Sequence, residues 1–323
     1  MSSSTAALTA PGKPGFPARA GRAIERFFLA PAWPTPLAVL RIGLALVLLV
    51  QAALIVPAFF VLYERSGVPR GLLRDALARH GLPHLGWLIH ALGRFGVGES
   101  TILVSTGLVY VASLLALLVG WRTRMVAAFA WLTHLTLMMT ANGTNYGADN
   151  FGNIFLFYLI WIPSGAALSM DRLANRAPAG PTTAARLALR VIQLHLCMVY
   201  LAGGLMKGSG GQWWDGDAIW RSLMLPEYRQ YDFCWLADHP WFARLSGWMV
   251  VAVETGYSIF IWPRRTRRPW ILATVAMHLG IALFMGLGIF GAIMIVFTVA
   301  AFGVGAEPRR EGQRATAQRG SGA

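Results

Sequence analysis

The chain has 323 residues, of which 56% are hydrophobic and only 13% are charged, so a soluble domain could not cover its apolar residues with a solvated surface. The formal net charge of +14 comes from short basic clusters between apolar runs, not from one basic face, which argues against a nucleic-acid-binding protein. The composition therefore predicts an all-α, polytopic integral membrane helical bundle whose main partner is the lipid bilayer.

The expected organisation is one membrane domain between two tails. Residues 1–26 begin with a stretch rich in Ser, Ala, Pro and Gly and are expected to form a disordered cytoplasmic tail; the basic residues 305–323 are expected to form a second one. Residues 27–304 contain eight apolar runs that are candidate membrane spans. These runs are Leu37–Val61, Thr101–Val119, Met125–Thr140, Gly152–Leu168, Leu187–Met206, Leu245–Trp262, Trp270–Met285 and Ile289–Val304. The last two could instead be one helix broken around Gly286 and Gly288.

The charges between the runs predict the orientation. If the N-terminus is cytoplasmic, the inner segments carry the whole net charge of +14, through clusters such as the arginines of residues 264–268, and the outer segments are neutral. This asymmetry is what the positive-inside rule predicts. The expected protein is therefore a multi-pass protein with both termini cytoplasmic and with its long outer loops facing the periplasm or a lumen.

Two charged residues, Arg41 and Glu254, lie within expected spans. Ionisable groups inside a membrane are costly and are usually paired or functional. Two interpretations are therefore open: a mutual structural ion pair between Arg41 and Glu254, or a role for them in a water-filled cavity or ligand site.

Lys207 is the clearest candidate for a chemical role. The 28 basic residues include only two lysines, Lys13 in the first tail and Lys207. A guanidinium stays protonated, whereas an ammonium shielded from water can lose its proton and act as a base. Lys207 ends an expected span within the Gly-rich stretch 203–211, where small residues permit a close approach by a neighbour or ligand. The alternative is that Lys207 only extends to the outer membrane interface.

Two outer segments are rich in side chains that could hold a ligand. Trp213 and Trp214 begin a loop dense in aromatic residues, which suits either an interfacial belt or a platform for a flat ring such as a quinone. The polar loop 142–150 joins the third and fourth spans and is either an ordinary Asn- and Gly-rich turn or a second binding segment. It should lie near Lys207 only if the fourth and fifth spans pack together.

Three histidines, His134, His195 and His278, lie within expected spans and are each expected to make an interhelical hydrogen bond. His278 is the strongest exception, because it lies about 10 Å, at 1.5 Å per residue, below the outer end of its helix and within reach of a cavity under the Lys207 loop. No metal site is expected, since HxxxH and HExxH spacings are absent from the sequence. Walker, GxGxxG and GxSxG motifs are absent too.

The stretch Val199–Lys207, followed by Trp213-Trp214-Asp215-Gly216, resembles the membrane domain of the vitamin K-dependent gamma-carboxylase, which is shared with the horizontally transferred transmembrane (HTTM) family. Leu40–Leu44, the loop 142–149 and His278-Leu279-Gly280 agree in order, so that the similarity covers roughly residues 27–302. The most specific element is the run Tyr-x-x-Gly-Gly-x-x-Lys from Tyr200 to Lys207.

The resemblance implies a carboxylase-like enzyme of the carbon-carbon lyase class, in a bacterial inner (cell) membrane and with a periplasmic or extracellular active face. In that chemistry the lysine matching Lys207 deprotonates reduced vitamin K, or here a related menaquinol, and oxygenation of the anion to an epoxide generates a base that removes a γ-proton from a substrate Glu, so that carbon dioxide can add. Lys207 and His278 are then the expected catalytic residues. The expected substrate- or quinone-binding residues are Asn142, Asn145, Tyr146, Tyr200, Trp213 and Trp214.

Two departures change the expected substrate. The carboxylase has a histidine in the loop that matches residues 142–149, where this chain has Thr144 and Asn145. It also has a large lumenal C-terminal domain that binds a propeptide. A small acidic or peptide substrate, or quinol oxygenation alone, is therefore expected. The alternative is a non-catalytic membrane factor for peptide maturation, export or immunity, with a transporter as a third reading.

Overall fold

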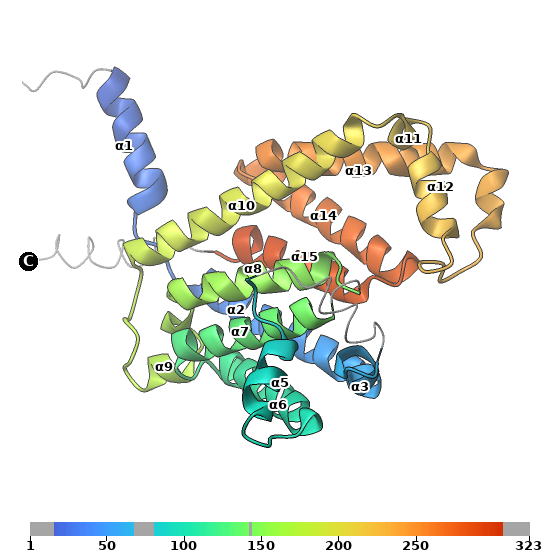
Figure 1. Ribbon diagram of the computed structural model, residues 1–323. Coiled ribbons are helices and arrows are strands. Elements are labelled where there is room, and N and C mark those ends of the chain that lie inside the picture. The colour runs from blue at the N-terminus through green and yellow to red at the C-terminus, as the bar shows by residue number, and fades with distance from the viewer. Residues whose placement is uncertain (1–15, 68–80, 142–143, 306–323) are drawn as a thin grey trace, which may run out of the picture.

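The computed structural model describes residues 16–67, 81–141 and 144–305, which form helices joined by short turns (Figure 1). The main helices are α1 (Phe16–Leu29), α2 (Thr35–Ile55), α3 (Phe59–Tyr63), α5 (Leu85–Gly93), α6 (Glu99–Val119), α7 (Thr123–Thr140), α8 (Gly147–Trp161), α9 (Met170–Leu173), α10 (Thr183–Gly208), α11 (Gly211–Trp214), α12 (Asp217–Met224), α13 (Pro240–Phe260), α14 (Arg264–Phe284) and α15 (Gly288–Thr298). Short 3-10 turns are η1 (Val56–Ala58), η2 (Ser164–Ala166) and η3 (Cys234–Ala237), and a π-helical turn is η4 (Val299–Gly303). An isolated bridge between Ala32 and Thr182 is the only β-pairing among these described residues.

The expected all-helical class is confirmed, and three segments are long and apolar enough to cross a membrane. These are residues Thr35–Tyr63, Glu99–Val119 and Thr183–Gly208. Large apolar side chains on their outer faces are exposed, such as Leu54 at 66% and Leu108 at 65%. Exposed apolar faces of this kind are suited to contact with lipid. Each of the eight apolar runs overlaps at least one helix, although the number of spans does not follow from length and composition alone.

Two expected helix limits need correction. The run Gly152–Leu168 does not form one helix: α8 begins earlier, at Gly147, and ends at Trp161. It ends there because Ile162 precedes Pro163 and takes an extended conformation, as residues before proline prefer. Residues 16–26, expected as part of a disordered tail, form most of α1. The remaining tail residues, 1–15 and 306–323, lie outside the described residues.

The final two runs form two helices rather than one broken helix. Gly286 adopts φ 69° in the turn between α14 and α15, a left-handed conformation that glycine takes at little cost. The two helices then pack against each other along their length. Because of this turn, α15 begins at the end of the bundle where α14 ends.

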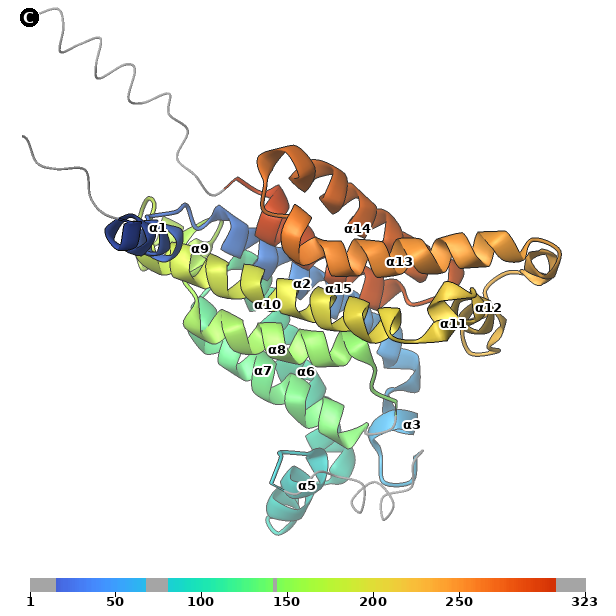
Figure 2. The same ribbon diagram turned by 90° about the horizontal axis from the view of Figure 1, so that it is seen from above.

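The bundle is organised around α2, which packs against α6, α15 and the turn η2. Its buried residues Leu37, Leu40, Leu44 and Leu48 recur every three or four positions, so they form one stripe facing the core. On one side α6, α7 and α8 pack in sequence, and on the other α10 pairs with α13 and α14 with α15 (Figures 1 and 2). The helix α13 extends beyond the end of α10, where α11 and α12 pack on it.

The two ends of the bundle differ. The helices α1 and α9 lie at one end, here called the basic end, while α3, α11 and α12 lie at the other, here called the loop end (Figure 1). The ends of α10 and α14 and the start of α8 also lie at the loop end. The polar groups considered below are therefore gathered at the loop end by chain reversal, although they are distant in the sequence.

Arg41 stabilises the basic end and is not paired with Glu254. The guanidinium is fully buried and donates hydrogen bonds to the carbonyl oxygens of Ser164 and Leu168, in the turn that follows α8. Gly120 makes room for it, because a Cβ there would lie 3.0 Å from Arg41 Cζ. The expected Arg41–Glu254 ion pair is wrong: α2 brings Arg41 to a turn with free carbonyl groups, and α13 brings Glu254 to α10 instead.

Candidate functional site

Lys207 and Glu254 form an ion pair between α10 and α13. The Lys207 Nζ atom lies 2.7 Å from Oε1 and 2.6 Å from Oε2 of Glu254. The side chain of Lys207 is 28% exposed and that of Glu254 only 10%. A carboxylate is costly to bury alone, so the ammonium compensates its charge. Glu254 was singled out in the sequence as an intramembrane charge, but its partner was not identified.

Two glycines of α10 allow this contact. A Cβ at Gly204 would lie 2.6 Å from the backbone nitrogen of Thr255, and one at Gly203 would lie 3.1 Å from Oε2 of Glu254. Both distances are shorter than an ordinary van der Waals contact, and at Gly204 the neighbour is backbone, so glycine at that position lets the two helices approach this closely. The Gly-rich stretch before Lys207 therefore sets the position of its partner helix.

The two expected tryptophans have different surroundings. The Lys207 amine lies 5.4 Å from the centre of the Trp213 ring, within the range of a cation–π contact. Trp214 instead donates from Nε1 to the carbonyl of Gly208 at 2.8 Å, and its own carbonyl accepts from Trp248. Trp213 therefore belongs to the site around Lys207, whereas Trp214 caps the last carbonyl of α10.

A second polar contact lies deeper in the same region. The hydroxyl of Tyr200 is 2.8 Å from Nε2 of His278 and 3.4 Å from Oγ1 of Thr298, and its ring stacks on Tyr257. His278 is buried, and its Nδ1 atom has no hydrogen-bond partner. Tyr200 precedes Lys207 by two helical turns and therefore shares its face of α10. We call Tyr200, Lys207, Trp213, Glu254 and His278 the Lys207 centre.

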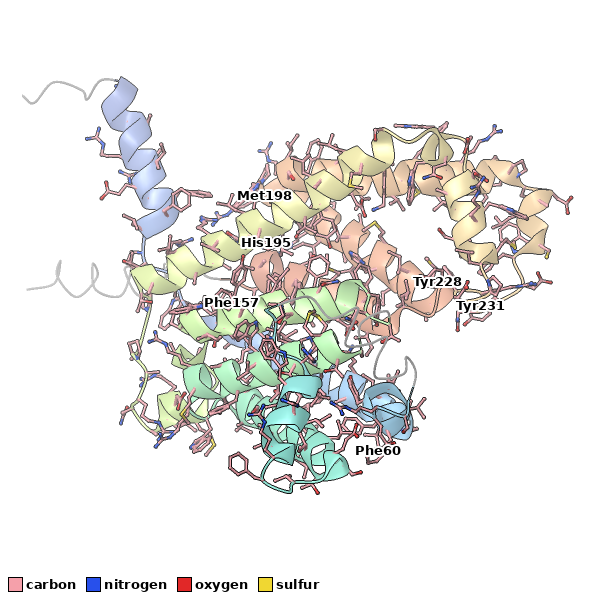
Figure 3. All side chains as sticks on the ribbon, in the orientation of Figure 1. Phe60, Phe157, His195, Met198, Tyr228 and Tyr231 are labelled. Carbon is pink, nitrogen blue, oxygen red and sulfur yellow. The ribbon has the colours of Figure 1, made fainter. Side chains whose placement is uncertain are left out.

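The expectation that the histidines link helices is confirmed. Besides the His278 contact between α14 and α10, His134 on α7 bonds to Tyr110 on α6 at 2.9 Å. His195 on α10 lies toward α8, where its Nδ1 atom is 2.7 Å from the hydroxyl of Tyr158 (Figure 3). No group of three or more His, Cys, Asp or Glu side chains suited to a metal occurs within residues 16–67, 81–141 and 144–305.

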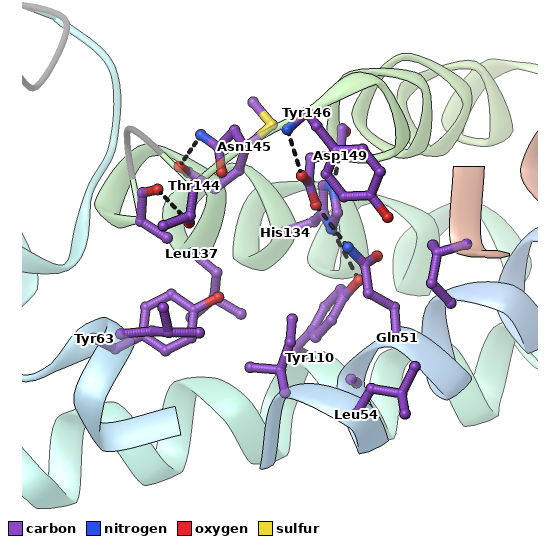
Figure 4. Close-up of a pocket in the computed structure, with 16 residues that line it drawn as sticks. Gln51, Leu54, Tyr63, Tyr110, His134, Leu137, Thr144, Asn145, Tyr146 and Asp149 are labelled. Carbon is purple, nitrogen blue, oxygen red and sulfur yellow. Dashed lines mark hydrogen bonds between the residues drawn. The ribbon is translucent and has the colours of Figure 1, made fainter. Parts of the chain in front are cut away.

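The remaining expected residues line a separate hollow at the loop end. Asn145 and Tyr146 border a cavity of about 320 Å³ between α2, α7 and α8, here called the Asp149 cavity (Figure 4). Lys207 does not line it, and Asn142 lies outside the described residues. The helix α8 packs mainly on α7 and α15, so the packing of the fourth and fifth spans that would bring this loop to Lys207 is not the main contact of α8.

Phe290, at the start of α15, lies between the Lys207 centre and the Asp149 cavity. Its ring centre is 5.7 Å from that of His278, and a Cβ at Gly147 would lie 2.9 Å from its edge. Ile289, the residue before it, lines the Asp149 cavity. The Lys207 centre and the Asp149 cavity are thus neighbours at one end of the bundle, separated by the first turn of α15.

Hydrogen bonds fix the wall of the Asp149 cavity. The Asp149 carboxylate accepts from Nε2 of Gln51 at 2.7 Å and from the backbone N–H of Tyr146 at 3.0 Å. Burial, and then the charge of Asp149, raise the pKa of Tyr146 to about 12, so that its phenol stays neutral. The sequence marked Asp149 only as part of a polar loop. Gln51, Tyr63 and Tyr110 were missed, because polar residues in apolar runs acquire meaning only when the helices are packed.

The Lys207 centre can therefore hold and move a proton between an amine and a carboxylate, beside a buried histidine and an aromatic ring. The Asp149 cavity can hold a small molecule.

Comparisons of this chain with protein-family models, with curated proteins and with solved structures find no match.

Proposed function

We propose that this chain is a bacterial inner-membrane enzyme, similar to the gamma-carboxylase membrane domain, that uses the Lys207–Glu254 pair as a base toward a reduced quinone. The observation that carries the proposal is the contact of Nζ with both oxygens of Glu254, at 2.6 and 2.7 Å. In a setting of low polarity two buried charges are costly, and a proton shift from nitrogen to oxygen would leave a neutral amine and a neutral acid. That neutral amine is the base that the chemistry requires.

The residues around the pair fit a flat ring with a hydroxyl group. Trp213 supplies an aromatic face next to the amine, and the unpartnered Nδ1 of His278 is a buried polar atom within the same centre. In this proposal Glu254 keeps the proton that it received from the amine, Lys207 takes the hydroxyl proton and becomes an ammonium again, and Tyr200 orients His278 through its hydrogen bond. A bound hydroquinone would supply the reducing chemistry: oxygen converts it to an epoxide and water and so drives carboxylation of an acidic substrate by carbon dioxide.

The proposal also includes a membrane topology with more spans than the three helices that are long and apolar enough to cross a membrane. Eight spans, at α2–α3, α6, α7, α8, α10, α13, α14 and α15–η4, would place the loop end in the periplasm and both termini in the cytoplasm. The two described ends of the chain lie on the same side of the bundle, which supports an even number of spans (Figure 1).

A native cysteine tests this topology. Cys234 lies exposed at the loop end, whereas Cys197 is buried. A membrane-impermeant maleimide should label Cys234 in intact spheroplasts, and the variant Cys234→Ser should not be labelled. The hydrogen bond and negative charge of Asp232 raise the pKa of Cys234, so labelling should be faster at pH 8.5 than at pH 7. Labelling that appears only after the membrane is permeabilised would reverse the orientation.

Activity is tested on the purified full chain in detergent. We would incubate it with a reduced menaquinone and oxygen and measure epoxide by mass spectrometry. We expect Lys207→Met and Glu254→Gln each to lower turnover at least 100-fold, and the double variant to remain inactive although it removes both charges. Arg221→Gln, which breaks an exposed ion pair with Asp217 at the same end, is the matched control and should keep full turnover. No epoxide from the unaltered protein, or equal turnover by Lys207→Met, would overturn the proposal.

A second function is favoured by one observation. The same ion pair joins α10 to α13 where Gly204 lies against Thr255, so it also serves as a structural link. A non-catalytic membrane factor for peptide maturation, export or immunity would need only the packing of α10 on α13, and not a proton transfer within the pair. For such a factor, a deletion strain would be complemented by the Lys207→Met/Glu254→Gln double variant as well as by the unaltered protein.

A further inference from the structure

The Asp149 cavity has hydrogen-bond acceptors left over. The ring of His134 donates from Nε2 to the carbonyl of Asp149 at 3.1 Å, so its Nδ1 must accept the proton of the Tyr110 hydroxyl at 2.9 Å. The amide nitrogen of Gln51 is used by the Asp149 carboxylate, and that of Asn145 by the carbonyl of Met138 at 2.7 Å. The ring N–H of His134 and one N–H of each of these two amides are therefore already occupied.

Three oxygens of the lining can still accept hydrogen bonds. The amide oxygen of Gln51 is buried and has no hydrogen-bond partner. The carboxylate of Asp149 accepts two hydrogen bonds out of about four that a carboxylate can accept. The hydroxyl oxygen of Tyr110 keeps its acceptor capacity after donating to His134. A ligand that satisfies these oxygens must bring donors.

The cavity lining also carries a negative charge. Asp149 is the acidic residue of the lining, and no lysine or arginine is among the described residues that line it. Asp149 is the third residue of α8, and its carboxylate caps the start of that helix. The positive end of the helix dipole therefore compensates part of the carboxylate charge. No ion pair joins Asp149 to a basic side chain in the part of the chain that the structure describes.

Aromatic rings complete the enclosure. Tyr63, Tyr110 and Tyr146 come from three different elements and surround the hollow, with Asp149 and Gln51 on one wall (Figure 4). The faces of such rings carry negative electrostatic potential and attract cations. Leu54, Leu137 and Ile289 supply apolar surface to the rest of the lining. The volume of about 320 Å³ suits a small organic molecule rather than a peptide.

We propose that the Asp149 cavity binds a small organic ammonium, a protonated primary amine on a compact apolar body. The ammonium lies against the Asp149 carboxylate and the tyrosine rings, where its N–H groups reach the oxygens that lack donors. The apolar body lies against the aliphatic part of the lining. This site does not include Lys207, and the inference holds whether or not the proposed function is correct.

The test uses two probes of equal size and opposite charge state. Phenethylamine is protonated at pH 7, and 2-phenylethanol is its neutral counterpart. We would titrate each into the purified full chain in detergent micelles by calorimetry and follow thermal stability in parallel. The unaltered protein should bind phenethylamine saturably and at least 10-fold more tightly than 2-phenylethanol.

The variants separate charge from folding. Asp149→Asn keeps an oxygen that can cap α8 but removes the charge, and it should abolish the preference for the amine. Tyr63→Leu should weaken binding of the amine more than that of the alcohol. Asp217→Asn, which removes an acid at the exposed side of the same end, should leave both affinities unchanged. Failure of phenethylamine to bind, equal affinity for both probes, or an amine preference that survives in a folded Asp149→Asn variant would overturn the proposal.

Discussion

Glu254 reaches Lys207 across the surface of Gly203, so that both carboxylate oxygens contact the amine at 2.6 and 2.7 Å. The pair sits where α10 ends and where α13 continues past it toward α11 and α12. It therefore lies at the boundary between the packed helices and the loop end. Any chemistry of the amine depends on this partner, and so does the contact between the two helices.

Removing one member of the pair should cost more stability than removing both. Lys207→Met leaves a buried carboxylate without compensation, and we expect a loss on the order of 2–3 kcal/mol, somewhat below that of a fully buried pair because Lys207 is partly exposed. Adding Glu254→Gln removes the stranded charge, so the double variant should recover more than half of that loss. Thermal unfolding of all three variants in one detergent measures this. Additive losses in the double variant would show that the two side chains are not coupled.

The close approach of α10 and α13 should make Gly204 sensitive to a single methyl group. The Cβ of Gly204→Ala would lie 2.6 Å from the backbone nitrogen of Thr255, which cannot move aside as a side chain can. We expect a loss of about 1–3 kcal/mol, although alanine favours the helix. Gly288→Ala is the control, because a Cβ there meets nothing within 4 Å, and its melting temperature should stay level or rise slightly. Equal effects of both substitutions would argue against tight packing at Gly204.

Arg41 should be needed for folding rather than for activity. Replacing it by Met removes the donors to the carbonyl groups of Ser164 and Leu168 and leaves those oxygens buried. Each unsatisfied group costs about 1–3 kcal/mol, so Arg41→Met should strongly reduce the yield of folded protein. Arg124→Met, at an exposed site at the start of α7, should change stability by less than about 0.5 kcal/mol. A normal yield and melting temperature of Arg41→Met would contradict this role.

The sequence was sufficient to locate the helices but not their partners. Long apolar runs at Leu37–Val61 and Leu187–Met206 predict helices because each must satisfy its own backbone hydrogen bonds. The partner of a buried charge depends on which helices pack together, and nothing in one sequence specifies that. For this reason a mutual pair of Arg41 and Glu254, the two charges within apolar runs, was one of the two open interpretations, although different neighbours hold them at separate places.

The candidate site shows the same limit. A spacing of seven residues places Tyr200 and Lys207 on one face of α10, whereas the chemical role expected for them stays a prediction. The loop that contains Asn145 and Tyr146 was expected to contribute to a ligand site and lines the Asp149 cavity instead of the Lys207 centre. Its position follows from the packing of α8 on α15, which depends on Gly147 fitting against Phe290.

Acid should weaken the basic end through Asp171. Its carboxylate accepts hydrogen bonds from the backbone N–H groups of Arg122 and Thr123, the hydroxyl of Thr123 and Nε of Arg176. Burial alone would raise the pKa of Asp171, but these bonds together lower it below its usual 3.8.

A carboxyl whose pKa is lowered by folding adds stability above the pKa of the unfolded chain, and that stability is lost as the pH falls through the lower, folded value. The melting temperature of the unaltered protein should therefore exceed that of Asp171→Asn at pH 7, and the gap should narrow as the pH falls from about 5 to about 3. Asp238→Asn, a substitution in an exposed loop, should show little gap at any pH. A difference between the unaltered protein and Asp171→Asn that stays constant down to pH 3 would mean that the four hydrogen bonds do not favour the charged carboxylate.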